Sequence, residues 1–353
     1  MPRSGGAWGA ALVLILSGFA VSSLATIGGL PNTADGVLHL FRALELVRAW
    51  EQGVIYPRWA PDFAFGFGYP IFNYVPPLLR YLSGLASLTG LSMQDALKVV
   101  VCLASLASGL GVYLLGRQFS GVLPAAAAGA AYALAPYRLF ELYVQGNYPQ
   151  LLAGAVAPYC LWAGHRLSRR GDGMSFLGLS AATAALALSH NISAMLFAPL
   201  FAAYLVWRAL AEGIKHHWLL MALALLGGGL MAGFFWLPAL AEQRYVQTWR
   251  LTQDFFDFRH RFLSFREVVA LPEVLDFRCA NPYFPMSLGG HLLVLGVPSL
   301  ALIGRKDRAT GHVAFMWVAL LGYAFLMLPE SAPVWELVPV LAYAEFPHRL
   351  LGV

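Results

Sequence analysis

The chain has 353 residues, of which 59% are hydrophobic and only 12% are charged, with a mean hydropathy of +0.64 and a formal net charge of +5. In soluble domains about a quarter of the residues are charged, and a fold in water cannot bury this much apolar surface. The composition therefore excludes a soluble domain. The apolar runs are long and lack the alternation of barrel strands, which favours membrane-spanning helices of about 20 residues each. The positive charge lies in short clusters typical of cytoplasmic loops, so nucleic acid is not an expected partner.

The first apolar run covers residues 8–30, follows Arg3 and ends at Pro31. A cleaved signal peptide is one interpretation, but the run is long and lacks a clear small-residue cleavage site. We therefore expect a retained first helix with a cytoplasmic N-terminus. Residues 36–52 come next and place apolar side chains on one face and charged side chains on another. This pattern predicts an amphipathic helix lying in the outer membrane interface.

Further apolar stretches follow at residues 75–91, 96–116, 122–135, 148–167, 176–190, 192–211, 218–240, 287–304, 313–328 and 334–343. Basic clusters at 165–170, 215–217 and 305–308 are expected in the cytoplasm, by the positive-inside rule. Residues 31–74, the turn at His190 and the long loop 241–286 are then outside.

Three apolar stretches lie between the outer positions Asn73 and Asn147, although an even number of crossings is needed there. We expect residues 75–91, which begin close to Pro76-Pro77, not to cross; the short stretch 122–135 is the alternative. The expected fold is an all-α polytopic bundle of about ten transmembrane helices, forming a single domain over residues 1–353. The chain stops at Val353 without a polar tail, so we expect a missing C-terminal region.

Asp35 lies between the first helix and the amphipathic helix, at the outer face. Aspartate at this position often caps a helix, and Thr33 is an equally suitable cap. A carboxylate at the outer face is also suited to act as a general base. The sequence leaves both roles open, and they are compatible with each other.

Several short polar and aromatic motifs are distributed over most of the chain. They are DGVLHLFR at 35–42, GVIYPRWAPD at 53–62, GFGYP at 66–70, NYVPPLL at 73–79, GNYP at 146–149, LSHN at 188–191 and EFPHR at 345–349. Together they resemble the C-type (GT-C) membrane glycosyltransferases. More narrowly, they are similar to the bacterial membrane proteins labelled 6-pyruvoyl-tetrahydropterin synthase-related, a label that implies no pterin chemistry here.

The resemblance implies a GT-C-like fold and transfer of a sugar from a polyprenyl-phosphate donor at the outer face of the bacterial inner membrane. It implies that Asp35 is the catalytic carboxylate, acting as base or helping to hold a divalent metal such as Mg²⁺ or Mn²⁺. His39 lies one helical turn after Asp35, but no third metal ligand is evident, so the sequence assigns no metal site. Outer water and cationic neighbours are expected to keep the pKa of Asp35 low.

The other candidates for substrate and phosphate binding are His39, Arg42, Arg58, Arg80, Glu141, His190 and Arg349. Arginine suits a phosphate because its guanidinium binds it through paired hydrogen bonds. Structural alternatives exist: Arg42 pairing with Glu45, Arg58 and Arg80 reaching lipid headgroups, and His190 ending a helix.

The loop around Gly146 departs from many GT-C proteins, because Gln145 and Gln150 stand where Arg and Glu are expected. Glu141 is the nearby acid that could substitute, and the departure puts a metal-dependent mechanism in doubt. Two rival functions remain open: a transporter or flippase of lipid-linked or polar substrates, and a non-catalytic membrane assembly protein. Few charges lie near the centres of the apolar stretches, which disfavours an ion-coupled carrier.

Overall fold

A computed structural model describes the chain except for residues 1–5, 212–216, 272–285, 291–293, 295 and 303–307. The described part is helical, and its only strand-like feature is an isolated antiparallel bridge between Ala60 and Tyr69. The basic clusters expected at 215–217 and 305–308 lie largely outside the described residues, as does the end of the loop 241–286.

The longer helices, in chain order, are α1 (Gly6–Val21), α2 (Gly36–Glu51), α3 (Leu78–Ser87), α4 (Met93–Gly116), α5 (Val122–Ala133), α7 (Tyr148–Arg170), α8 (Gly173–Ser189), α9 (Asn191–Ala211), α10 (Trp218–Met231), α11 (Gly233–Ala241) and α14 (Arg308–Leu326). Shorter pieces are α6 (Pro136–Phe140), a π-helical turn (Glu141–Gln145), α12 (Phe265–Val268) and α15 (Ala332–Leu337). The amphipathic segment expected at 36–52 is therefore confirmed as a helix.

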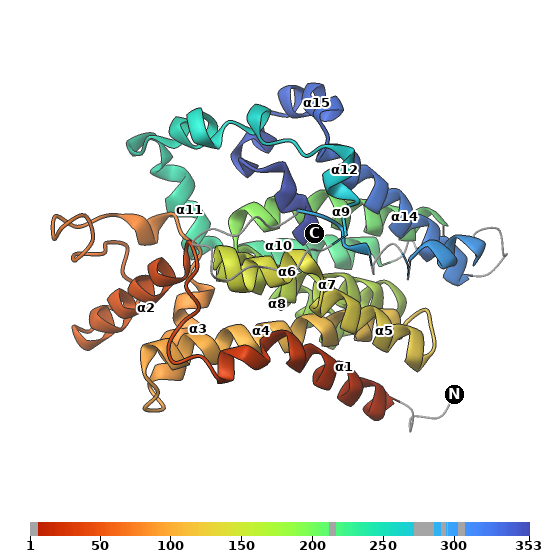
Figure 1. The fold of residues 1–353 in the computed structure, drawn as a ribbon, viewed down its shortest axis with the longest axis horizontal. Coiled ribbons are helices and arrows are strands. Elements are labelled where there is room, and N and C mark those ends of the chain that lie inside the picture. The colour runs from red at the N-terminus through yellow and green to blue at the C-terminus, as the bar shows by residue number, and fades with distance from the viewer. Residues whose placement is uncertain (1–5, 212–216, 272–285, 291–293, 295, 303–307) are drawn as a thin grey trace.

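Helix α4 is central, because it packs against α1, α5 and α7, while α7 packs against α8 and α8 against α10 (Figure 1). Helices α1 and α4 are antiparallel: Lys98 Nζ donates to the carbonyl oxygen of Ile27 at 3.1 Å, and Tyr113 Oη donates to that of Gly6 at 2.8 Å. Small residues allow α4 to pack closely against both α1 and α5, since a Cβ on Gly109 would lie 2.5 Å from Ser17 Oγ on α1 and 3.0 Å from the carbonyl oxygen of Gly129 on α5. Close helix contact of this kind is typical of helices in lipid.

Among the described residues, three helices are long and apolar enough to cross a membrane: Gly6–Ala25, Met93–Gly116 and Asn191–Leu210. Two bent pairs raise the number to five if each pair is one span: α10 with α11, bent by 69°, and residues 310–326 with 329–337, bent by 91°. A bundle of about ten spans therefore stays a prediction.

The stretch 218–240 was expected to be one helix and is instead broken at Ala232. The break frees the carbonyl oxygen of Gly229, and the indole Nε1 of Trp236 donates to it at 2.8 Å. The stretch 334–343 is likewise not one helix, because α15 ends at Leu337 and a 3₁₀ segment, Pro339–Ala344, follows. Pro339 lacks the backbone N–H that would continue α15, which explains why the helix ends before it.

Candidate functional site

The N-terminus of α2 is capped by Thr33 and not by the side chain of Asp35. Thr33 Oγ1 accepts a hydrogen bond of 3.1 Å from the backbone amide of Gly36. Asp35 occupies the N-cap position, but its carboxylate makes no capping hydrogen bond and lies half-buried. Of the two capping candidates in the sequence, Thr33 therefore performs the capping, and the Asp35 carboxylate is left available for other interactions.

The backbone of the Asp35 loop is docked on the π-helical turn before α7. Ala34 N donates to the carbonyl oxygen of Val144 at 3.1 Å, and Asp35 N donates to that of Gln145 at 2.8 Å. Gly146 follows with a φ of 71°, and a Cβ there would collide with Thr33 Oγ1 and with the amide nitrogen of Gly36. Glycine is thus required at this contact. Single π-helical turns often mark functional sites.

Two guanidinium groups from opposite ends of the sequence act on the Asp35 carboxylate. They belong to Arg42, two turns along α2, and to Arg349, in the 3₁₀ segment Pro347–Gly352. Both lower the pKa of Asp35, but burial raises it more, so the pKa lies above its usual value. The expectation of a low pKa from outer water and cations was therefore wrong, because the carboxylate is partly removed from water.

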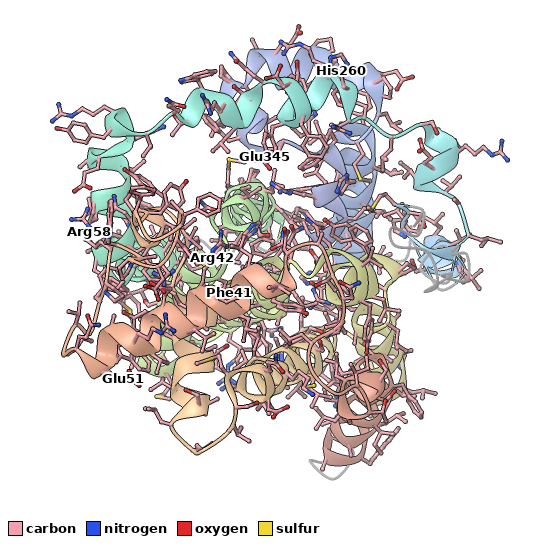
Figure 2. The ribbon with its side chains drawn as sticks, turned by 60° about the vertical axis from the view of Figure 1, so that its left-hand side comes forward. Phe41, Arg42, Glu51, Arg58, His260 and Glu345 are labelled. Atoms are coloured by element: carbon pink, nitrogen blue, oxygen red, sulfur yellow. The ribbon has the colours of Figure 1, made fainter. Side chains whose placement is uncertain are left out.

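Arg42 lies in the middle of the view in Figure 2, with Glu345 from the C-terminal segment above it. Its Nη1 lies 3.5 Å from His39 Nδ1, and its Nε is buried without a hydrogen-bond partner. The alternative pairing of Arg42 with Glu45 is not observed, since Glu45 pairs with Arg48 at 3.7 Å. Arg42 therefore retains donor capacity beside Asp35.

Arg349 is held by a tight turn. Its Nη1 lies 2.9 Å from Glu345 Oε2 and donates to the carbonyl oxygen of Ala344 at 3.0 Å, while its Nε is buried without a partner. Glu345 has a φ of 63°, a left-handed value that is uncommon for a non-glycine residue. Strained backbone persists where surrounding contacts enforce it, and it is common at functional sites.

The two histidines of the prediction lie at the same end of the fold. The His39 ring packs 5.9 Å from that of Tyr148, and burial lowers the pKa of His39 to about 3, so the ring is neutral. His190 Nδ1 accepts a 3.2 Å hydrogen bond from the amide of Ser193, which is the structural role that the sequence left open. His190 nevertheless lies close enough to His39 and Arg349 to interact electrostatically with both.

Glu141, the first residue of the π-helical turn, is fully buried, and neither of its carboxyl oxygens has a hydrogen-bond partner. Burial raises its pKa to about 8, although Arg138 and Arg349 lower it. Glu141 is therefore largely protonated at neutral pH, below the surface on which Asp35 lies. A Cβ added to Gly352 would lie 3.7 Å from Glu141 Oε1, so the C-terminal segment covers this carboxyl.

Arg58 and Arg80 have other partners. Arg58 forms an ion pair of 2.5 Å with Glu242 and donates to Asn73 Oδ1 at 2.8 Å from Nε, which ties the segment between α2 and α3 to the end of α11. Arg80 is buried; its Nη1 donates to the carbonyl oxygen of Val75 at 2.8 Å and its guanidinium lies 4.5 Å from the centre of the Phe72 ring. Electrostatic interactions thus connect six of the eight predicted site residues, Asp35, His39, Arg42, Glu141, His190 and Arg349, and Arg80 also lies close enough to Arg42 to interact with it.

Sequence reasoning missed the parts that assemble this cluster. Gly146 and Glu345 matter through their backbone conformations, and only the motifs GNYP and EFPHR gave a signal for them. Within the described residues, no group of three or more His, Cys, Asp or Glu side chains is arranged to hold a metal ion.

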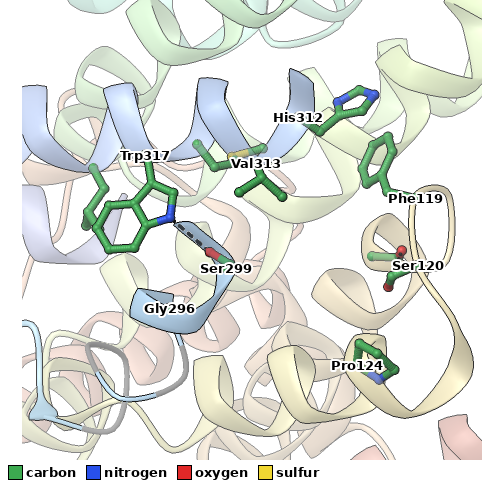
Figure 3. Close-up of a pocket in the computed structure, with 11 residues that line it drawn as sticks. Phe119, Ser120, Pro124, Gly296, Ser299, His312, Val313 and Trp317 are labelled. Atoms are coloured by element: carbon green, nitrogen blue, oxygen red, sulfur yellow. Dashed lines mark hydrogen bonds between the residues drawn. The ribbon is translucent and has the colours of Figure 1, made fainter. Parts of the chain in front are cut away.

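A cavity of about 540 Å³ lies elsewhere, between α14 and the α4–α5 turn. Figure 3 shows its lining, with His312 and Phe119 at one end and Trp317 donating to Ser299 Oγ at 2.9 Å. None of the predicted site residues lines it.

The long apolar helices and the polar cluster at one end of the bundle define a helical membrane protein. The profile of the family described as "6-pyruvoyl-tetrahydropterin synthase related domain; membrane protein" matches residues 72–351, and the chain belongs to this family. The match includes Glu141, His190 and Arg349, whereas Asp35 and Arg42 precede it. No individual curated protein matches the chain.

Proposed function

We propose that this membrane protein transfers a sugar from a polyprenyl-phosphate donor at the outer membrane face, with Asp35 as the general base. The observation that carries the proposal is the position of the Asp35 carboxylate. It is not used for capping, it is half-buried, and it lies within the fields of Arg42 and Arg349. A carboxylate beside two guanidinium groups suits a reaction in which a proton is taken up while a phosphate departs.

Sugar transfer requires one bond to break, one bond to form and one proton to move. The bond between the anomeric carbon and the phosphate oxygen breaks, and the phosphate keeps the electron pair. The acceptor hydroxyl oxygen forms a bond to the anomeric carbon, and its proton goes to Asp35. A pKa raised by burial makes Asp35 a stronger base, while Arg42 and Arg349 stabilise the charge that develops on the phosphate.

The resemblance to GT-C proteins also suggests that Asp35 helps to hold a divalent metal. The proposal uses the base role, because the neighbours of Asp35 in this cluster are two guanidinium groups and a neutral histidine, which do not favour a divalent cation. Glu141 acts in this scheme from beneath the cluster, through Arg349, and not as a direct ligand of the substrate.

The proposed setting is the bacterial inner membrane, with many spans, a cytoplasmic N-terminus and Asp35 outside. Arg170, at the end of α7, is then cytoplasmic. Reporter enzymes fused after Arg170 should report the cytoplasm, and an external signal there would invert the topology.

A transporter or flippase is the rival proposal. The cations and carboxylates of the cluster lie on the amphipathic helix α2, at helix ends and in turns, which suits chemistry at an interface better than passage through the bundle. A non-catalytic assembly protein would keep the same fold without turnover.

The test is a reconstitution in lipid nanodiscs with a set of polyprenyl-phosphate sugars. We expect saturable binding of at least one donor lipid, followed by release of the polyprenyl phosphate when an acceptor is present. Binding without release in every donor and acceptor combination, together with movement of the lipid between leaflets, would favour a flippase instead.

A further inference from the structure

The segment between α2 and α3 contains a small hairpin, residues 60–69, that presents aromatic side chains outward. Ala60 and Tyr69 exchange two backbone hydrogen bonds, of 2.9 and 3.0 Å, which close the hairpin. At its tip the Phe65 side chain is 102% exposed and that of Phe67 is 86% exposed. Residues 63–69 contain no charged side chain. We call this segment the aromatic hairpin.

The backbone of the aromatic hairpin is built to hold these side chains away from the protein. Ala64 and Phe65 are consecutive non-glycine residues with φ values of 52° and 59°, a conformation that L residues rarely adopt. Gly68 has a φ of 80°, and a Cβ there would collide with the indole of Trp59. Trp59 therefore packs over Gly68. Three backbone hydrogen bonds within the turn, from Gly66, Phe67 and Gly68, stabilise this shape.

Two ion pairs connect the base of the aromatic hairpin, and the residues just before it, to helices α2 and α11. Asp62 forms an ion pair with Arg48 on α2. Arg58, two residues before the hairpin, pairs with Glu242 at the end of α11. The hairpin is thus held next to the helix whose N-terminus carries Asp35.

The exposed apolar side chains of helix α11 indicate that the hairpin lies near lipid. Phe234, Leu237 and Leu240 on α11 are 51%, 54% and 61% exposed, and α11 with α10 forms one of the candidate spans. These side chains face lipid in a membrane protein. The polar group of Arg58 and Glu242 marks the end of this apolar surface, where a membrane gives way to water.

We propose that the aromatic hairpin inserts Phe65 and Phe67 into the headgroup region of the outer leaflet and anchors α2 at the bilayer surface. Aromatic side chains are enriched at this depth, where apolar rings leave water while nearby polar groups remain hydrated. Two highly exposed phenylalanines on a strained turn have no role in packing the chain on itself, but they fit the interface where lipid headgroups meet the first segments of the acyl chains. This anchoring does not depend on the proposed sugar transfer.

The test places an environment-sensitive fluorophore at the tip in a background where Cys102, Cys160 and Cys279 are replaced. Phe65→Cys and Phe67→Cys are each labelled, and the protein is reconstituted in nanodiscs of phosphatidylethanolamine and phosphatidylglycerol with lipids spin-labelled near the headgroup. Because both side chains are exposed, the substitutions remove no internal packing. Gln52→Cys, at the exposed C-cap of α2, is the polar control, and Leu237→Cys is the lipid-facing control.

We expect both tip positions to show blue-shifted emission, quenching by the spin-labelled lipid close to that of Leu237→Cys, and protection from aqueous iodide. Emission typical of water, with iodide quenching equal to that of Gln52→Cys at both positions, would overturn the proposal. Protection from iodide without lipid quenching would also overturn it, because it would show that protein and not lipid covers the hairpin.

Discussion

The backbone amide of Asp35 donates a hydrogen bond of 2.8 Å to the carbonyl oxygen of Gln145. This contact places the loop before α2 on the π-helical turn before α7, so the position of the Asp35 carboxylate depends on a segment far along the chain. The residue that follows Gln145 is Gly146, and its lack of a side chain makes the contact possible. The cluster around Asp35 is therefore a tertiary arrangement and not a property of α2 alone.

Gly146→Ala should destabilise the protein and displace the Asp35 loop. A left-handed alanine costs about 1–2 kcal/mol, and the added Cβ would also collide with Thr33 Oγ1. The measurement is thermal unfolding in detergent. Gly90→Ala is the matched control, because Gly90 has a φ of 90° but nothing within 4 Å of its Cβ position. Equal losses for both variants would show that the close approach is unimportant.

The buried Glu141 carboxyl should make stability depend on pH in a defined direction. Its pKa is about 8 in the folded state against 4.5 for an ordinary glutamate, so between these values the folded protein holds a proton that the unfolded chain releases. The unfolding free energy should therefore fall as pH rises from about 4.5 to about 8 and stop falling above it.

Glu141→Gln removes this titration, so the variant should become more stable relative to the original chain as pH rises. The difference between the melting temperatures of the two proteins from pH 6.5 to 9 isolates the effect, because buried histidines such as His39 and His348, which bind protons near pH 6.5 only in the unfolded chain, contribute equally to both proteins. A difference in melting temperature that stays constant over that pH range would contradict the assignment of a protonated buried carboxyl.

The arginines should separate into two groups when donor binding is measured. Arg42→Gln should weaken the binding of a polyprenyl phosphate by roughly 10- to 100-fold, the value of one charge-assisted hydrogen bond. Arg349→Lys keeps the charge but loses the planar donors, so a smaller loss is expected. Binding to nanodisc-embedded protein can be followed by native mass spectrometry.

Arg58→Gln is the control for this series. Its partly exposed pair with Glu242 is worth about 0–1 kcal/mol, so donor binding and yield should change little. If Arg58→Gln weakens donor binding as much as Arg42→Gln does, the phosphate lies nearer the end of α11 than the account places it.

Local sequence patterns predicted the elements that depend on short-range chemistry. The charge pattern of residues 36–52 gave α2, and the apolar runs gave α4, α7 and α9 to within a few residues. The break at Ala232 was missed, since a run of apolar residues looks the same whether its helix is straight or bent by 69°.

The candidate site was predictable only in part, for a related reason. Asp35, His39 and Arg42 are neighbours along one helix, and helical spacing is enough to group them. Arg349 reaches the same place from the other end of the chain, through a left-handed Glu345 that no propensity rule favours. The sequence also could not show that Thr33 caps α2, because Thr33 and Asp35 both suit that role and only the loop geometry decides between them.

The central claim is that the charge of Asp35 serves chemistry and not folding, and the Asp35→Asn variant tests it most directly. Asparagine keeps the shape of the side chain, and Thr33 already caps α2, so folded yield should match the original protein. Loss of the base should lower the rate of sugar transfer by about 10²- to 10⁴-fold. Thr33→Ala is the matched control: it should lose about 1 kcal/mol of stability and keep most of its activity per folded molecule. Normal yield with unchanged sugar transfer in Asp35→Asn would contradict the account.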